Sequence, residues 1–472
     1  MNSEEVFNTL RGSFPFQLNN GQRELLGRLA RFLISKEQQP VFVLKGYAGT
    51  GKTTVVRSLV ASLPAVNAKS VLLAPTGRAA KVLNNYTGKA AFTIHKKIYM
   101  KKSVAGGGFA FQLRPNLYKN TLFIVDEASM ISNSKGLSFQ GQSSVLDDLF
   151  SFVFSGNNCK LLLIGDTAQL PPVKLNISPA LDLNFIQQSY PFHLESFELT
   201  EVMRQNQDSG ILANATQLRD EINFADAPSP KFNINPYQDI VPLTGEELED
   251  AINSAYSKYG VEDTMIICRS NKRANIYNQQ IRTRIRWQED ELSSGDYMMV
   301  VKNNYYWLPE ESKAGFIANG DIIQLSSVGT IEDMHGFRFA QVRFKMVDYP
   351  DEPELETLLL LDTIMSENPA LSSAENNKLY ESVLADYADI SNAKERLKKV
   401  KEDKYFNALQ VKFSYAITCH KSQGGQWPCV FVEQGYLTKE MVNKEYLRWL
   451  YTAVTRASKQ LYLINFNDSF YN

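Results

Sequence analysis

The chain has 472 residues, of which 44% are hydrophobic, so it can bury several cores and we expect two to four domains. Its 50 basic and 51 acidic residues give a net charge of -1, which excludes a protein that coats duplex DNA by charge alone but permits a narrow basic channel. The four cysteines form no CxxC pair, so we expect free thiols in a reducing cytoplasm and no zinc site. The N-terminus has no secretory signal pattern, and no apolar run of about 18 residues occurs, so we expect no membrane span.

Four short apolar runs alternate with helical patterns over the first two hundred residues. They lie at 41–46, 70–76, 121–127 and 160–166, and each contains or ends in Gly, Pro or Asp. Continuous apolar strands separated by helices predict an α/β fold, with a parallel sheet covered on both faces. Ligands of such sheets bind at the carboxyl ends of the strands.

The segment GYAGTGKT at 46–53 directly follows the first of these strands. Its glycines allow backbone N–H groups to cradle phosphate oxygens, and the next helix adds its N-terminus. Lys52 is placed to reach the β and γ phosphates of ATP, and Thr53 is placed to hold Mg²⁺. The predicted nucleotide contacts in this loop are Gly46, Ala48, Gly49, Thr50, Gly51, Lys52, Thr53 and Thr54.

A pair of carboxylates ends the third apolar run, in IVDEAS at 124–129. The strand end places both at the sheet edge beside the phosphate loop. We expect Asp126 to bind Mg²⁺ and Glu127 to orient and deprotonate the attacking water. The adjacent Glu favours hydrolysis by water over a kinase or GTPase, which would more often carry a different base.

The downstream segments interrupt and then resume the α/β pattern. Gly-Gly-Gly between two alternating stretches predicts a β-hairpin at 101–120, and alternation with Asn-Gly and His-Gly turns predicts a small antiparallel β unit from about 316. Residues 351–406 are polar with a helical period, which is typical of a solvated helix face. The second α/β pattern comprises a strand at 264–270, a helix from Lys272, and apolar runs at 415–424, 430–433 and 460–466.

In chain order, the motifs resemble those of superfamily 1B helicases, the branch of RecD-like and Dda-like enzymes. The matching segments are LNNGQ (18–22), GYAGTGKTT (46–54), APTGRAAKVL (74–83), TIHKKIY (93–99), VDEAS (125–129), GDTAQLPPV (165–173), LTEVMRQ (199–205), YAITCHKSQGGQW (415–427) and LYTAVTRA (450–457). Their shared order is far more specific than any single motif. The resemblance implies an ATP- and Mg²⁺-dependent DNA helicase that translocates 5′ to 3′ on single-stranded DNA, unwinds duplexes at single–double strand junctions, and serves replication, recombination or repair.

The resemblance also implies the domain organisation. We expect two RecA-like parallel-sheet motor domains, with the hairpin as a strand-separating pin and the β unit as an Src-homology-3-like barrel insert. Motor domain 1 is expected over 1–200, with the pin at 100–120, and motor domain 2 over 201–315 and 407–472. The barrel with a helical extension is expected over 316–406. Because both halves of the ATP site lie in one chain, we expect a monomer.

Further site residues come from the resemblance. It implies that Gln22 reads adenine, that Gln169 contacts the γ-phosphate, and that Arg204 and Arg456 act as arginine fingers. Gln426 takes a ribose contact where family members often have Glu. Strand contacts are implied for Pro75, Thr76, Arg78, Thr93, His95, Phe109, Phe111, Thr418, His420, Lys421 and Ser422.

Several alternatives remain open at this level. Phe109 and Phe111 share one face of the hairpin, where they would either stack on bases or hold the hairpin to the body. A nucleic-acid-stimulated ATPase remodeller and an RNA helicase are the competing functions. A phosphate-loop kinase would not need the later motifs, and residue chemistry alone gives no direction of travel.

Overall fold

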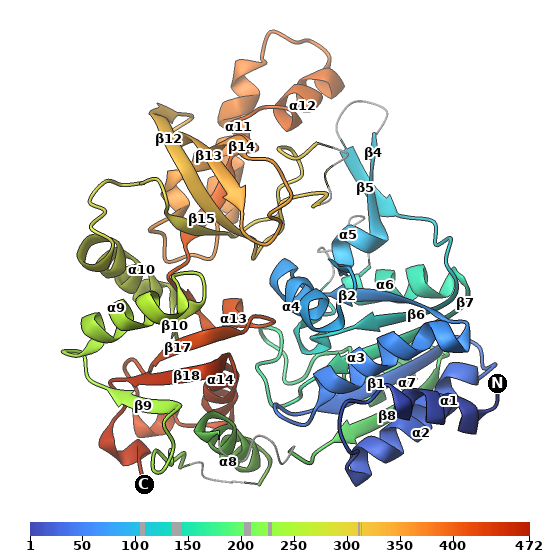
Figure 1. The fold of residues 1–472 in the computed structure, drawn as a ribbon. Helices are drawn as coiled ribbons and strands as arrows, with labels where there is room; N and C mark the ends of the chain where they lie inside the picture. Colours follow the sequence, from blue (N-terminus) through green and yellow to red (C-terminus); the bar gives the residue numbers. More distant parts are fainter. Residues whose placement is uncertain (104–108, 135–142, 203–208, 225–228, 310–311, 313) are drawn as a thin grey trace.

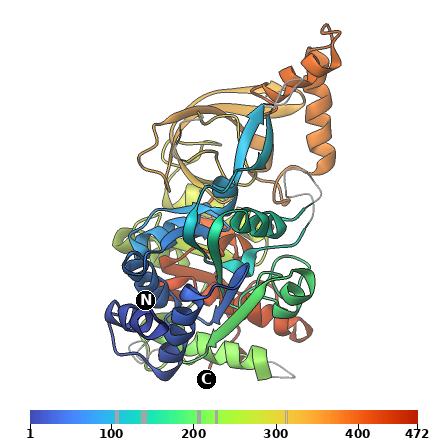
Figure 2. The ribbon, with the colours of Figure 1, turned by 90° about the vertical axis from the view of Figure 1, so that its right-hand side faces the viewer.

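Two parallel sheets, a small barrel and a two-stranded hairpin make up the protein (Figure 1). The computed structural model describes residues 1–103, 109–134, 143–202, 209–224, 229–309, 312 and 314–472. The two sheets lie side by side, the barrel stands beyond the second sheet, and the hairpin projects from the first. Turned by 90°, the helical extension of the barrel extends farthest from the sheets (Figure 2).

Six parallel strands form the first sheet, in the order β3-β2-β6-β7-β1-β8. They are β1 (Pro40–Gly46), β2 (Lys69–Ala74), β3 (Ala91–Thr93), β6 (Lys119–Val125), β7 (Asn157–Gly165) and β8 (His193–Leu199). Phe42 and Leu44 pack with α1 (Ser3–Gly12), α2 (Asn20–Ile34) and α3 (Lys52–Ser62), whereas Val41 and Val43 pack with α5 (Ile94–Ile98), α6 (Val145–Phe154) and α7 (Leu183–Ser189). The predicted parallel sheet with two covered faces is therefore confirmed.

Five parallel strands form the second sheet, in the order β16-β10-β17-β18-β9. They are β9 (Ile240–Leu243), β10 (Thr264–Cys268), β16 (Ala416–Thr418), β17 (Trp427–Glu433) and β18 (Ala457–Ile464). One face packs with α9 (Leu248–Tyr259) and α10 (Asn271–Gln280), and the other with α8 (Gly210–Phe224) and α14 (Lys444–Val454). The short α13 (Cys419–Ser422) follows β16.

The barrel is closed by five strands, four of the five neighbouring pairs being antiparallel and the β14–β15 pair parallel. These are β11 (Tyr297–Val300), β12 (Ile322–Met334), β13 (Phe337–Met346), β14 (Leu355–Leu360) and β15 (Leu409–Phe413), with α11 (Ser373–Asp386) and α12 (Ala393–Lys401) between the last two.

The barrel differs from the expected 316–406 unit in two respects. Its first and last strands, β11 and β15, lie outside that range and close it through long-range pairing that no local turn signal announces. In addition, β14 is a strand within the stretch expected to be helical. A short buried apolar run such as LETLLL has no period that separates strand from helix.

The predicted hairpin is present. Strand β4 (Tyr99–Ser103) pairs antiparallel with β5 (Phe109–Leu113), and Ser103 lies opposite Phe109. The Gly-Gly-Gly turn lies outside the described residues, as do the side chains of residues 101–111.

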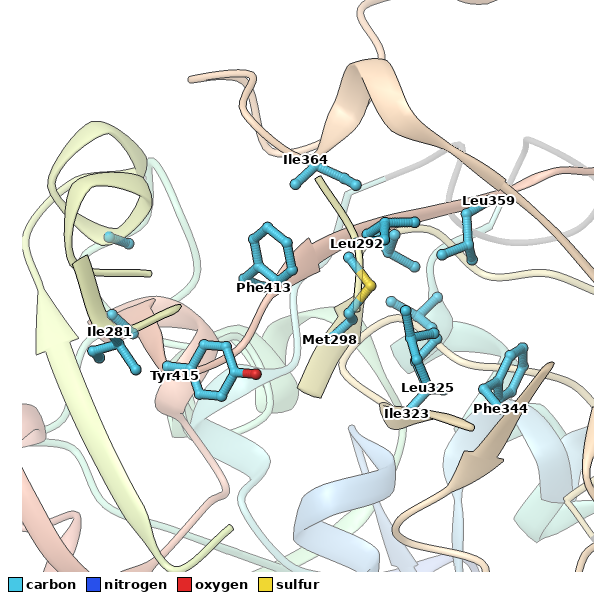
Figure 3. Packing of buried hydrophobic residues seen from close by; sticks show 14 of the residues in the cluster. Ile281, Leu292, Met298, Ile323, Leu325, Phe344, Leu359, Ile364, Phe413 and Tyr415 are labelled. Atoms are coloured by element: carbon cyan, nitrogen blue, oxygen red, sulfur yellow. The ribbon is translucent and has the colours of Figure 1, made fainter. Parts of the chain in front are cut away.

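The barrel and the second sheet share one hydrophobic core (Figure 3). Phe413 ends the barrel strand β15, and Tyr415 immediately precedes β16 of the sheet, so both rings lie in this core. The Arg282 guanidinium donates to both carboxylate oxygens of Asp296 at 2.9 Å, and the Tyr415 hydroxyl donates to the same carboxylate. This ion pair is buried and holds the barrel and the sheet together. Removing either partner would leave the other as an unpaired buried charge, which is strongly destabilising.

All four cysteines are buried free thiols. Burial raises the pKa of the Cys268 and Cys419 thiols, which keeps them protonated and unreactive. Among the described residues, none of the helices combines the length and the apolar composition that crossing a bilayer requires.

Candidate active site

The phosphate loop joins β1 to α3 at the edge of the first sheet. Gly49 and Gly51 have φ of 76° and 87°, a left-handed conformation that non-glycine side chains rarely adopt, and Gly51 caps α3. The Lys52 ammonium donates to the carbonyls of Gly46 at 2.6 Å and Tyr47 at 2.8 Å. The Lys52 ammonium is thus held against the backbone of the loop itself.

Two carboxylates follow β6, as the sequence predicts. Asp126 accepts hydrogen bonds from the Tyr86 hydroxyl at 2.6 Å and from the Glu127 N–H at 2.9 Å. Glu127 has φ of 54°, an uncommon conformation for this residue type, of the kind found at functional sites. Desolvation raises the pKa of the Glu127 carboxyl, while the nearby positive charges of Arg456 and Lys52 oppose that rise.

A cavity of about 820 Å³ lies between the two sheets, and both contribute to its wall. The Arg456 side chain is 4% exposed and donates to the carbonyls of Thr452 and Gly425. The amide oxygen of Gln169 is buried without a partner among the described atoms. The lining residues anticipated from the sequence are Ala48, Gly49, Gly51, Lys52, Thr53, Thr54, Asp126, Glu127, Gln169, Gln426 and Arg456.

Tyr451 is a site residue that the sequence reasoning missed. Its hydroxyl, on α14 behind the second sheet, accepts from the Ala48 N–H of the phosphate loop at 2.8 Å and donates to Asp166 at 2.6 Å. Beside it, the Thr452 hydroxyl accepts from the Leu170 N–H at 2.8 Å. One turn of α14 therefore ties the phosphate loop and the β7 loop to the second sheet. The only local signal is an aromatic hydroxyl five residues before Arg456 in the same motif.

Some expected nucleotide contacts lie elsewhere. The Gln22 side chain accepts from the Asn19 N–H in the capping box that starts α2, and it is fully buried rather than part of the cavity wall. Phe16, six residues earlier, lines the cavity instead and is 49% exposed. Gly46 and Thr50 belong to the loop but do not line the cavity, and Arg204 lies outside the described residues.

The expected strand contacts of the first sheet gather at one end of it. Pro75 and Thr76 follow β2, and the Thr76 hydroxyl caps α4 (Gly77–Thr87) by accepting from the Ala79 N–H. Thr93 caps α5 in the same way and is buried, so its hydroxyl is already engaged. The His95 ring lies 5.6 Å from that of Tyr99, and burial lowers its pKa.

Arg78 is held between elements of the barrel and the second sheet. Its guanidinium lies 4.9 Å above the Trp427 ring and 3.7 Å from Asp348, a barrel residue to which Lys81 also pairs at 3.2 Å. A second barrel carboxylate, Asp321, approaches Gly77 so closely that a Cβ there would meet it at 2.3 Å. Two buried acids thus face the start of α4.

The expected contacts after β16 divide into exposed and internal groups. The His420 side chain is exposed and Thr418 is half-buried. Lys421 instead directs its ammonium inward, where it has no partner among the described atoms, and burial lowers its pKa to about 8. The Ser422 hydroxyl is buried and donates to the Cys419 carbonyl at 2.8 Å. Neither Lys421 nor Ser422 presents its polar group at the surface.

The two lobes also touch through backbone. Gly424 has φ of 73°, and a Cβ there would lie 2.7 Å from that of Ala79 on α4, so only glycine allows this approach. The Gln423 amide donates to the Leu170 carbonyl at 2.6 Å. Phe109 and Phe111 stand on β5, but their side chains lie outside the described part of the chain.

Comparison with known proteins places these features in context. Residues 17–226 match the family model of an AAA domain, and residues 413–464 match that of a UvrD-like helicase C-terminal domain. The uncharacterised protein R530 of Acanthamoeba polyphaga mimivirus is 24% identical over 94% of this chain and 99% of its own length.

Two relatives are named as ATP-dependent DNA helicases. RecD2 of Deinococcus radiodurans is 33% identical over 39% of this chain and 24% of its own length, and Dda of Enterobacteria phage T4 is 29% identical over 43% and 42%. The alignments thus span less than half of either helicase. Among solved structures, the Pif1 helicase from Bacteroides with ADP-AlF3 and ssDNA is 14% identical over 97% of this chain and 95% of that one, with a TM-score of 0.46.

The two matched models occupy opposite ends of the chain, and each contributes one wall of the same cavity. Together with the similarity to RecD2 and Dda, this supports a relationship to the superfamily 1B helicases.

Proposed function

We propose that the protein is an ATP-dependent DNA helicase that translocates 5′ to 3′ along single-stranded DNA and unwinds duplex at single–double strand junctions. One observation carries this proposal. Lys52 and Glu127 from the first sheet and Arg456 from the second line a single cavity within one chain. A hydrolase that needs no movement would not have to divide its site between two lobes.

The residues present fit ATP with Mg²⁺. Thr53 is exposed and lines the cavity, and Asp126 offers a carboxylate held in place by Tyr86, so these two residues would hold the ion. Mg²⁺ held there would offset negative charge on the triphosphate. The phosphate loop and Lys52 would hold the triphosphate, and the exposed ring of Phe16 offers a surface for the base.

The hydrolytic step uses Glu127 as the base. Its raised pKa makes the carboxylate a stronger proton acceptor, while Lys52 and Arg456 nearby favour its ionised form. Arg456 then offsets negative charge that develops on the transferred phosphoryl group, an effect worth about 1000-fold or more for arginine fingers. Gln169 lines the cavity, and its amide N–H₂ group would donate to the terminal phosphate and so sense its presence.

Movement follows from the divided site. A triphosphate held by the first lobe attracts Arg456 on the second, and its loss removes that attraction, so the lobes alternate between two separations. If each lobe grips the strand in turn, every cycle advances the chain. Contacts at Gly424 and Gln423 link strand-facing loops to the cavity wall.

The two sheets are the RecA-like motor domains, over 1–200 and over the segments on either side of the barrel. The barrel is the Src-homology-3-like insert, its strands lying between 297 and 413. The β4–β5 hairpin is the pin, and Phe109 and Phe111 alternate on β5 so as to share one of its faces. The names of the RecD2 and Dda relatives support DNA over RNA as the substrate.

Unwinding of tailed duplexes tests the proposal. With Mg-ATP, the protein should separate a duplex with a 5′ single-stranded tail and leave a 3′-tailed duplex intact, while Lys52→Ala separates neither. Matched RNA substrates test the sugar preference. ATPase activity stimulated by single strands without any unwinding would identify a remodeller instead, and activity confined to 3′ tails would contradict the direction.

A further inference from the structure

Helix α4 joins the two places where ligands of the proposed motor are expected. It starts directly after Pro75 and Thr76, two of the expected strand contacts, and its 11 residues span about 16 Å. Val82, Asn85 and Tyr86 in its last two turns line the nucleotide cavity. A single helix thus reaches from the strand end of the first lobe to the phosphate site.

The far end of α4 holds the carboxylate that would bind Mg²⁺. The Tyr86 hydroxyl donates to Oδ2 of Asp126 at 2.6 Å, and the Glu127 N–H donates to Oδ1 at 2.9 Å. The second donor belongs to the backbone that carries Asp126 itself, whereas Tyr86 comes from a separate element. The Tyr86 ring packs against the core that contains α2 and α3, so α4 sets the position of its hydroxyl. The orientation of the Asp126 carboxylate therefore depends on where α4 lies.

The near end of α4 is held by the barrel through a loosely made ion pair. Oδ1 of Asp348 lies 3.2 Å from Nζ of Lys81 and 3.7 Å from Nη1 of Arg78, and the Asp348 side chain is 1% exposed. Neither of its carboxylate oxygens accepts a hydrogen bond from the atoms that the structure describes. A strand phosphate offers Arg78 the bidentate partner that Asp348 does not provide here, so the phosphate would displace the carboxylate.

The side of α4 that carries Tyr86 also meets the second lobe. Ala79, Val82 and Tyr86 have i, i+3 and i+7 spacing, which places them on one side of the helix. A Cβ at Gly424 would lie 2.7 Å from the Ala79 Cβ, so the loop after α13 abuts this side. A helix held at one end by a replaceable ion pair can shift along such a loop, and packed helices shift by about 1–2 Å in transitions of this kind.

We propose that Tyr86 is a positioning residue that links strand binding at the start of α4 to the orientation of Asp126. A strand phosphate that replaces Asp348 at Arg78 moves α4 against the Gly424 loop, and Tyr86 carries the movement to the carboxylate. A short hydrogen bond to a charged oxygen depends steeply on distance and angle, so a small movement of the helix changes it. The inference rests on the proposed function.

The test measures the affinity for fluorescent Mg-ADP with and without saturating oligothymidylate. In the wild-type protein the strand should change this affinity about tenfold, and Mg-ADP should change the strand affinity by the same factor, because coupling between two binding sites is reciprocal. Tyr86→Phe should reduce both ratios to about twofold or less, while the nucleotide-free variant binds the strand as the wild type does. Tyr190→Phe is the matched control, because it removes a hydroxyl that donates to Asp147 in the same lobe but outside the cavity wall, and it should keep the wild-type ratios.

A second arm separates positioning from loss of packing. In an Asp126→Ala background, Tyr86→Phe should have no further effect on either ratio, because the hydroxyl acts only through that carboxylate. A coupling that survives Asp126→Ala and is then removed by Tyr86→Phe would show a different route and overturn the inference. Thermal unfolding midpoints of Tyr86→Phe and Tyr190→Phe should fall by similar amounts, since each variant loses one hydroxyl donor to a carboxylate.

The outcomes distinguish this inference from the proposed function. Wild-type ratios in Tyr86→Phe, or wild-type affinities that the second ligand does not change, would overturn the role of Tyr86, and unwinding of 5′-tailed duplexes by the wild-type protein would leave the helicase assignment intact. If no single strand stimulates ATP hydrolysis by the wild-type protein, the proposed function fails, and the role of Tyr86 fails with it.

Discussion

Replacing Tyr451 with Phe removes one hydroxyl and tests whether α14 couples the lobes. The substitution deletes the bond to the Asp166 carboxylate at 2.6 Å and leaves the Ala48 N–H of the phosphate loop without an acceptor. A hydrogen bond to a charged group contributes about 1.5–3 kcal/mol, and an unpaired buried donor costs about 1–3 kcal/mol. Because both bonds share one hydroxyl, we take the total to be about 2–4 kcal/mol.

The effect should appear in catalysis as well as in stability. If half of that energy, about 1–2 kcal/mol, holds the phosphate loop in its hydrolytic arrangement, kcat/KM for ATP falls about 5- to 30-fold. Steady-state ATPase assays with saturating single-stranded DNA measure this directly. Tyr462→Phe is the matched control, because that ring stacks on Phe431 in the second sheet and has no hydroxyl contact recorded among the described residues. A Tyr451→Phe enzyme within twofold of wild type, with an unchanged urea midpoint, would refute the coupling.

Three further substitutions test separate parts of the account. Lys52→Ala should lower ATP turnover at least 1000-fold while strand binding, followed by fluorescence anisotropy, stays within about twofold; normal turnover would remove Lys52 from the site. Glu127→Gln should bind ATP but not hydrolyse it. In the wild-type enzyme, activity should fall on acidification at a pH above the usual carboxyl range, because the raised pKa of Glu127 means that its ionised form is lost at a higher pH. A pH profile without this fall in activity argues against Glu127 as the base. Burial raises the pKa of Asp321 from 3.8 to about 8, so between these pH values the folded state holds a proton that the unfolded state releases. The free energy of unfolding should therefore fall as pH rises from 4 to 8, by up to about 1.4 kcal/mol per pH unit. Asp321→Asn should flatten that dependence, whereas an unchanged slope would place the titration elsewhere.

The sequence predicted four strands of each sheet, because buried parallel strands are continuous apolar runs that need no distant partner to be recognised. It did not predict β3, β8 and β9. The phosphate loop and the carboxylates after β6 were also predictable, since a strand end fixes where the next two side chains lie. In the structure, these residues and Arg456 line one cavity.

The remaining features depend on contacts between distant segments. The hydroxyl of Tyr451 meets the phosphate loop only because α14 packs behind the second sheet, and no local pattern encodes that meeting. The sequence suggests that Thr93 and Ser422 present free hydroxyls to the strand. In the structure the Thr93 hydroxyl caps α5, and the Ser422 hydroxyl donates to the Cys419 carbonyl. The Lys421 ammonium is buried because α13 is a single turn, and the elements packed around it decide which of its side chains face inward. The ends of the barrel were missed because β11 and β15 pair across more than a hundred residues.

The joint between barrel and second sheet has a mechanical consequence. Since Arg282, Asp296 and Tyr415 lock one to the other and their cores are continuous, the barrel cannot swing by itself without exposing a charge and opening apolar surface. It is therefore a rigid arm of the second lobe. A movement of the second lobe would therefore carry the barrel with it, and would strain the contacts of Asp348 with Arg78 and Lys81 on the first lobe.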